Sequence, residues 1–154
     1  FIELKADVYP NAKDKSIQGK CTFEFKVKKQ TDTLKIDAKS MEINQVMMNG
    51  RSVQFINNGK QLVLFEGYST GSNTLSFTYF AQPKQTLYFV TVGNDTQIWT
   101  QGQGKYTSHW LPSFDDVNEK IVFNISVEFR NDFPVISNGA FISNKYNVVY
   151  ILSL

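Results

Sequence analysis

Two glutamines in the second half of the chain have the side-chain type and spacing to bind the end of a peptide. Gln101 and Gln103 flank Gly102, so an extended backbone would project both side chains to the same side. A glutamine carbonyl accepts a hydrogen bond from an ammonium group, and its NH₂ donates to a carbonyl. Two such contacts could hold the amine and the first carbonyl of a peptide, at about 1.5 to 3 kcal/mol for each bond to a charged group. On spacing alone, a solvated strand surface is the simpler interpretation.

The segment around these glutamines, residues 97–120, gathers both tryptophans, the only histidine and three carboxylates. Asp115 and Asp116 are adjacent, and adjacent side chains diverge, so they predict the cap of a short turn before the next strand rather than an acid/base pair. His109 has no serine or cysteine nucleophile motif beside it, which favours a structural role. We therefore expect no catalytic residue in this segment, and the residues alone leave the two glutamines open to peptide binding or to a solvated surface.

The chain lacks the ligands for a zinc site of its own. His109 is the only histidine and Cys21 the only cysteine, whereas zinc sites combine several histidine, cysteine or carboxylate ligands and an HExxH motif needs two histidines. The sequence thus predicts no metal site in this chain. The single cysteine also rules out an intrachain disulfide and leaves the cellular location open.

The rest of the chain, which must position this segment, has mostly the composition of β-strands. Alanine is rare, and aromatic and β-branched residues fill the apolar runs, so we expect an all-β chain. Apolar and polar residues alternate along two long segments, as in a strand with one buried face. Their expected inner residues are Cys21, Phe23, Phe25 and Val27 in the first segment, and Ile121, Phe123, Ile125, Val127 and Phe129 in the second.

Turn sequences divide the region between these two strands. Asn49-Gly50 predicts a type I′ hairpin turn, and a second turn at residues 57–59 makes residues 42–65 a three-stranded antiparallel meander. Further strands are expected around residues 74–79 and 86–91. No repeat or linker divides the chain, so residues 1–154 are interpreted as one domain.

Composition argues against two classes of partner. Sixteen Lys and Arg against fourteen Asp and Glu leave a formal charge of +2, too small to indicate nucleic-acid binding. A membrane-spanning helix needs about 20 consecutive apolar residues, and no run approaches that length. We therefore expect neither a nucleic-acid partner nor a membrane span.

The order of motifs from residue 97 to residue 139 resembles a known family. Gln101-Gly102-Gln103 is followed by Leu-Pro-Ser-Phe-Asp-Asp at 111–116, then Lys120 and Phe123, then Ile-Ser-Asn-Gly at 136–139. This pattern is similar to the N-terminal domain of the gluzincin zinc aminopeptidases, the family of aminopeptidase N and the leukotriene hydrolases. The upstream hairpins resemble its short bacterial members, so the likeness covers residues 1–139.

The resemblance implies a β-sandwich or saddle-like domain of mostly antiparallel stacked sheets. Such a domain packs on a thermolysin-like catalytic domain of the same polypeptide, which would hold the zinc. By motif match, Gln103 would contact the free α-amine at the substrate N-terminus, and Gln101 would line the first side-chain pocket. The expected function is thus substrate recognition in a peptide-trimming zinc aminopeptidase, with no catalysis by this chain alone. The alternative is a free-standing β-sandwich that binds peptide or carbohydrate.

Several positions depart from the family pattern. Val117 replaces a proline, Ser108 stands where arginine is common, and residue 103 is Gln rather than Glu. These changes predict a different geometry for the loop over residues 108–117 and a weaker attraction for an ammonium group. Residues 140–154 do not match the stretch that precedes the catalytic domain, which predicts a truncated or divergent end.

Overall fold

The computed structural model describes residues 1–93, 95–102, 105–116, 118–129, 134–145 and 148–153. Its elements follow the chain as β1 (Glu3–Asn11), β2 (Ser16–Val27), β3 (Leu34–Asp37), β4 (Met41–Met48), β5 (Arg51–Ser52), β6 (Phe55–Asn57), β7 (Gln61–Leu64), β8 (Gly71–Ala81), β9 (Leu87–Val92), β10 (Asp95–Thr100), the 3₁₀ helix η1 (Thr107–His109), β11 (Val122–Glu128), β12 (Ala140–Lys145) and β13 (Val148–Ser153). In these ranges no helix is long and apolar enough to cross a membrane.

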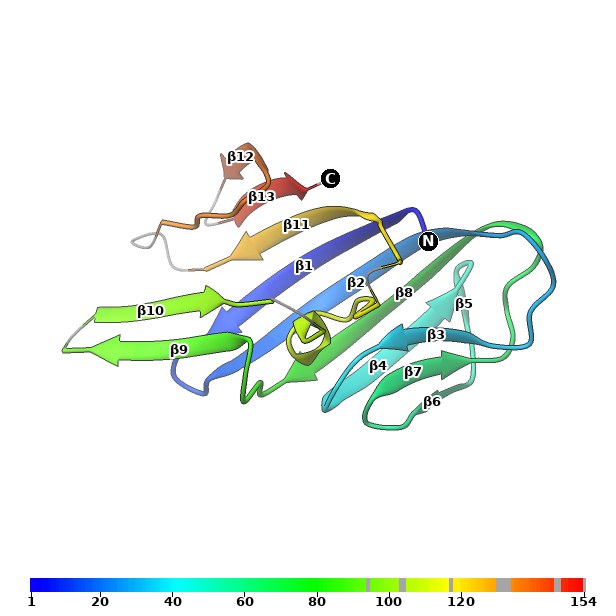
Figure 1. The fold of residues 1–154 in the computed structure, drawn as a ribbon, viewed down its shortest axis with the longest axis horizontal. Helices are drawn as coiled ribbons and strands as arrows, with labels where there is room; N and C mark the ends of the chain where they lie inside the picture. Colours follow the sequence, from blue (N-terminus) through cyan, green and yellow to red (C-terminus); the bar gives the residue numbers. More distant parts are fainter. Residues whose placement is uncertain (94, 103–104, 117, 130–133, 146–147, 154) are drawn as a thin grey trace.

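The described residues form three sheets (Figure 1). The largest has eight strands in the order β12-β13-β11-β1-β2-β8-β4-β5, and smaller sheets have the orders β3-β7-β6 and β10-β9. Strands β1 and β11 are parallel, whereas β2 runs antiparallel to both of its neighbours, β1 and β8. The all-β, mostly antiparallel fold expected from the sequence is confirmed.

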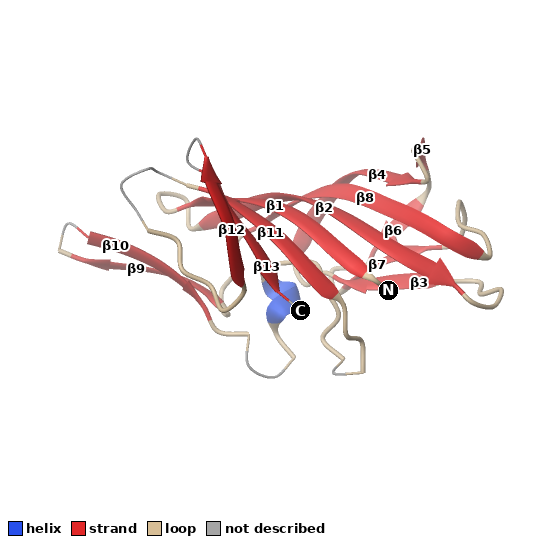
Figure 2. Ribbon diagram, turned by 90° about the horizontal axis from the view of Figure 1, so that it is seen from above, coloured by secondary structure: helices blue, strands red, loops and turns tan. Residues whose placement is uncertain are grey.

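The core lies between the eight-stranded sheet and the three-stranded sheet, which cover each other in Figure 2. The alternating pattern of β2 is confirmed, because its expected inner residues are all buried. They join buried side chains of β8 and of the three-stranded sheet, which include Leu75, Phe77, Ile36, Leu62 and Leu64. Burial of these apolar faces holds the two layers together.

The expected meander over residues 42–65 is wrong. The Asn49-Gly50 turn forms, with φ angles of 52° and 78°, but β5 ends at Ser52 and the next strand, β6, belongs to the other sheet. Crossing between layers lets β7 bury Leu62 and Leu64 completely against the large sheet. The turn signals marked two real turns but missed the break between β5 and β6, and they carried no information on which sheet each strand joins.

The strand predicted over residues 121–129 forms as β11, yet its inner face is less buried than expected. Phe123, Ile125 and Val127 pack against the core but are only partly buried. The three-stranded sheet lies toward the other end of the large sheet, over β4 and β8 rather than β11 (Figures 1 and 2). Part of the apolar face of β11 therefore stays accessible.

Residues 140–145 and 148–153, which do not match the family pattern in sequence, continue the large sheet. Strand β13 pairs with β11 and β12 pairs with β13, so this hairpin forms one edge of the sheet. Gly139 allows the close approach of the chain, since a Cβ there would lie 2.5 Å from the carbonyl oxygen of Leu152. Phe141 on β12 is 65% exposed, which leaves an apolar side chain on this edge.

Candidate functional site

The ribbon of β9 and β10 leads into the glutamine segment and projects from the large sheet (Figure 1). On one face, Phe89 and Ile98 are paired and pack against the core. On the other face, the Tyr88 and Trp99 rings stack with centroids 4.5 Å apart, and Trp99 is 46% exposed. The ribbon therefore presents an aromatic face just before Gln101.

Gln101 lies directly after β10, which ends at Thr100. Its backbone N–H donates to the carbonyl of Thr86 at 2.8 Å, and the residue is exposed. Gln103 falls outside the described residues, so the predicted alignment of the two glutamines stays a prediction. The described half of the pair has a fixed backbone and a solvent-accessible side chain.

Thr86 organises the base of the ribbon. It is buried and adopts a φ of 69°, a conformation that costs a β-branched residue about 1 to 3 kcal/mol. Its carbonyl accepts from Gln101, and its Oγ1 donates to the carbonyl of Tyr106 at 3.2 Å. Through these two hydrogen bonds, Thr86 links Gln101 to Tyr106, which lie on either side of residues 102–105.

The segment from η1 to Asp116 lies on the same side of the large sheet as the three-stranded sheet (Figure 2). Asp37 at the end of β3 and Ser113 exchange two backbone hydrogen bonds of 3.0 Å. Leu111 is buried, and the centroids of the Phe114 and Phe1 rings lie 4.4 Å apart. Backbone bonding and apolar packing therefore dock this segment onto β3 and the core.

Asp115 is the centre of a polar network rather than a turn cap. Its Oδ2 accepts from the Ser108 hydroxyl at 2.6 Å and from Lys39 Nζ at 2.7 Å, and its Oδ1 accepts from the Ser108 N–H at 3.2 Å. The turn expected of either aspartate is formed by Asp116, whose Oδ1 accepts from the Asn118 N–H at 3.0 Å. Ser108, where the resembling family commonly has arginine, supplies two donors, and the cation comes from Lys39.

The network shifts the pKa values of two groups. Burial would raise the pKa of Asp115, but hydrogen bonds from Lys39 and Ser108 and the lysine charge outweigh it and hold that pKa below its ordinary value. Burial and the charge of Lys39 lower the pKa of His109, against an opposing effect of Asp115. His109 Nε2 lies 2.8 Å from the Gln85 amide nitrogen. Because an amide NH₂ can only donate, Nε2 is the acceptor, as in a neutral imidazole. This contact agrees with the structural role predicted for His109.

The residues present do not fit a metal ion. Over the described ranges, no group of three or more His, Cys, Asp or Glu side chains could hold one. Cys21 is buried, and His109 faces Gln85 and Tyr106 rather than a second ligand. No chemical step is therefore derived from a metal bound by this chain.

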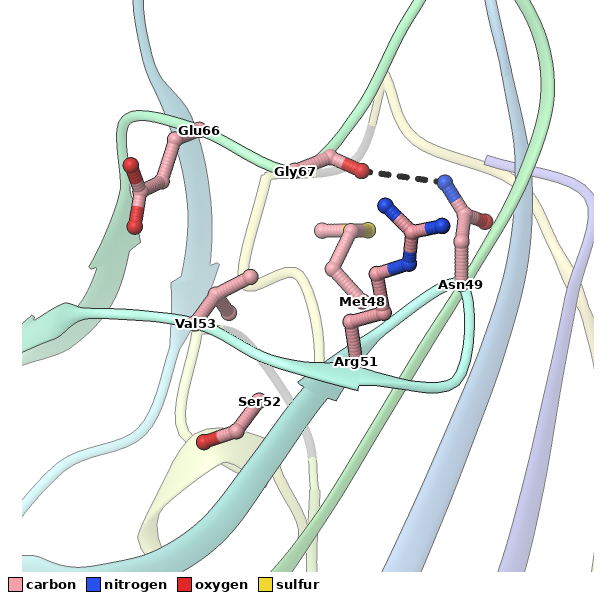
Figure 3. Close-up of a pocket in the computed structure, with 7 residues that line it drawn as sticks. All are labelled: Met48, Asn49, Arg51, Ser52, Val53, Glu66 and Gly67. Carbon is pink, nitrogen blue, oxygen red and sulfur yellow. Dashed lines mark hydrogen bonds between the residues drawn. The ribbon is translucent and has the colours of Figure 1, made fainter.

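A separate surface pocket lies beside the β4–β5 turn (Figure 3). The Asn49 amide donates to the Gly67 carbonyl at 3.0 Å and to Asn73 Oδ1 at 2.9 Å. Glu66 accepts from the backbone N–H of Gln54 at 3.3 Å. These hydrogen bonds hold the β4–β5 turn and the residues after it against the loop before β8. The polar groups beside the pocket therefore have structural roles.

Sequence reasoning missed Lys39 and Thr86. Lys39 is 76 positions from the aspartate that it contacts and lies in a stretch without a motif. Thr86 marked only the start of an expected strand. Adjacent Asp115 and Asp116 offered a signal, but their different roles depend on partners that only the folded chain brings near.

Known proteins are similar to this chain in sequence. The sequence model of the peptidase M1 N-terminal domain matches residues 3–148. A probable aminopeptidase 1 from Sulfurisphaera tokodaii is 26% identical over 122 residues, which cover 78% of this chain and 15% of that protein. The chain thus spans about a seventh of that relative's length.

Solved structures share the fold. Yeast LTA4 hydrolase in complex with bestatin superposes with a TM-score of 0.84 at 21% identity, over 98% of this chain and 26% of that one. The M1 zinc metallopeptidase from Deinococcus radiodurans gives 0.78 at 11% identity, over 98% and 37%. With the family model matching nearly its whole length, the chain belongs to the peptidase M1 N-terminal domain family.

Proposed function

We propose that this chain is the substrate-recognition domain of a zinc-dependent aminopeptidase, which removes N-terminal residues from peptides. The observation that carries the proposal is the family match over residues 3–148, combined with an exposed Gln101 whose backbone is fixed by Thr86. The catalytic partner would be a thermolysin-like domain of the same polypeptide. Relatives that are several times longer than this chain support that arrangement.

The proposed contribution of this chain is to bind and orient the peptide N-terminus. The Gln101 carbonyl oxygen can accept from a substrate N–H or ammonium group, while the amide NH₂ can donate to a peptide carbonyl. Gln103 takes the amine-contact position by motif match alone. Recognition of the free amine would restrict cleavage to the end of a peptide.

Zinc would supply a Lewis acid and an activated water in the catalytic domain. The described residues of this chain offer it no ligand set. We therefore propose that the chain is non-catalytic in isolation and acts through substrate binding. Zinc-dependent hydrolysis of an aminoacyl chromogenic substrate by the isolated 154 residues would contradict this.

Apolar groups are available for a partner domain. Phe123, Ile125 and Val127 are only partly buried, and Phe141 lies exposed in the strand at the edge of the same sheet. Burial of apolar area is the main driving force for such contacts. This accessible face supports docking of a second domain against the β11 end of the sheet.

The test is kinetic and uses the full-length polypeptide. Gln101→Ala and Gln103→Ala should each lower kcat/KM for a free-amine substrate by about tenfold, equivalent to about 1.4 kcal/mol. In Gln103→Ala, binding of the N-acetylated substrate as a competitive inhibitor should hardly change. Gln18→Ala is the matched control, because Gln18 is an exposed glutamine on β2. Equal losses with the free and acetylated peptides in Gln103→Ala would contradict its amine-contact role.

A cheaper test separates the proposal from a free-standing binding domain. The reading frame beyond Leu154 should encode HExxH followed by a further glutamate, the zinc-ligand pattern of the resembling family. A stop codon directly after Leu154 would instead favour an independent peptide- or carbohydrate-binding domain.

A further inference from the structure

Lys39, in the turn after β3, contacts the segment that follows Gln101 and Gln103 at several points. Its backbone N–H donates to the Ser108 carbonyl at 2.8 Å. Its Nζ donates to the Lys105 carbonyl at 3.0 Å and to Asp115 at 2.7 Å, and lies 5.7 Å from the centre of the Tyr106 ring. One side chain thus holds both the start and the end of this segment.

The ion pair between Lys39 and Asp115 is shielded from water. The Asp115 side chain is 8% exposed and that of Lys39 is 30% exposed. Screening by salt and water is weaker for such a pair than for surface charges. Removing Lys39 would leave a buried carboxylate without its cation, which is costly. The pair therefore favours one arrangement of the segment strongly over others.

The arrangement extends through Thr86 to Gln101. Tyr106, next to the Lys105 carbonyl that Lys39 binds, accepts from Thr86 Oγ1 at 3.2 Å. The carbonyl of Thr86 accepts from the Gln101 N–H at 2.8 Å. Gln101 is thus joined by two hydrogen bonds to the residues that Lys39 positions.

A rigid support lies behind the pair. Asp37 Oδ2 accepts from the Asp115 N–H at 2.9 Å, and its Oδ1 accepts from the Gln61 amide at 2.8 Å. Gln61 and Asp37 lie opposite each other in paired strands β7 and β3. The three-stranded sheet therefore holds the position of Asp115.

We propose that Lys39 and Asp115 are positioning residues for peptide binding, because their ion pair fixes Lys105 and Tyr106 and, through Thr86, the backbone of Gln101. The inference rests on the proposed function. Neither residue needs to touch the substrate. A binding group that shifts by about 1 Å loses much of its effect, so disturbing the pair weakens substrate binding.

The experiment measures KM and kcat of the full-length polypeptide with a free-amine aminoacyl p-nitroanilide. Lys39→Met and Asp115→Asn should each raise KM about tenfold, with a smaller change in kcat. Lys39→Arg keeps the cation and should restore KM to within about threefold of the parent value. Ser108→Ala removes a single donor to Asp115, and its smaller rise in KM carries the test if the other variants fail to fold.

Lys5→Met is the matched control. Lys5 pairs with Glu24 at 2.8 Å, nearly the same separation, but both side chains are about half exposed on the face of β1 and β2 opposite the core. Its removal should leave KM unchanged. Thermal unfolding of every variant ensures that KM is measured on folded protein.

The outcomes separate the two proposals. Unchanged KM in Lys39→Met and Asp115→Asn, with raised KM in Gln101→Ala, overturns the positioning role and leaves the proposed function intact. Unchanged KM in the glutamine variants overturns both. An equal rise in Lys5→Met would show a general effect of charge removal and overturn the positioning role.

Discussion

The central strands and the segment from Lys105 to Asp116 are held in place by different forces. Strands β2 and β8 bury whole rows of apolar side chains, among them Phe23 and Phe77. The segment combines apolar anchors, Leu111 and Phe114, with a directional polar network around Asp115. Apolar burial is non-directional and stabilises the layers, whereas charged hydrogen bonds fix geometry. The two layers thus depend mainly on apolar burial, whereas the geometry of the segment beside Gln101 depends also on hydrogen bonds and an ion pair.

The largest effect on stability is expected from the central strands. Phe23→Ala should lower the free energy of unfolding by about 3 to 5 kcal/mol, since the ring is completely buried and leaves a cavity. Urea unfolding measures this loss. A change below about 1 kcal/mol would contradict the assignment of this core.

A smaller loss is expected at the accessible end of the sheet. The sequence placed Phe123 on the inner face of its strand, but the ring is only partly buried, so Phe123→Ala should cost roughly 2 kcal/mol in the 154-residue chain. In the full-length polypeptide the cost should be greater if the proposed catalytic domain covers this face. Urea unfolding of both forms tests this, and equal losses would argue against an interface at β11.

Acid should weaken the polar network before the apolar core. The pKa of Asp115 is lower in the folded chain than its ordinary value, so its stabilising contribution is present above about pH 4 and is lost as the pH falls through the folded pKa. Unfolding of Asp115→Asn should therefore depend less on pH between about 4 and 2. Parallel stability curves for the parent and this variant would contradict the network's role.

The smallest effect on stability is expected at Gln101, the proposed binding residue. Gln101→Ala should change the free energy of unfolding by less than about 0.5 kcal/mol, because the side chain is exposed and the bond to Thr86 uses only the backbone. The same variant should still weaken binding of a free-amine substrate. A large drop in melting temperature would place the Gln101 side chain in the structural framework instead.

Much of the fold could be predicted because alternation reports a local property. The buried side chains of β2 and β8 and the Asn49-Gly50 turn follow from residues close together in sequence. The layer joined by β6, and the partial cover of β11, depend on segments far apart in sequence. The meander was therefore the expectation that failed, and the inner face of the second strand is less buried than its pattern suggested.

The features of the candidate site also separate into those that local sequence indicates and those that depend on distant segments. The motifs from Gln101 to Gly139 were enough to indicate the family, whereas peptide binding by Gln101 and Gln103 stays a prediction. Tertiary structure alone decided that Lys39 pairs with Asp115 and that Thr86 holds Gln101. Spacing fixes which side chains a short stretch can present, but a buried ion pair forms only where folding brings distant charges together and removes water from them.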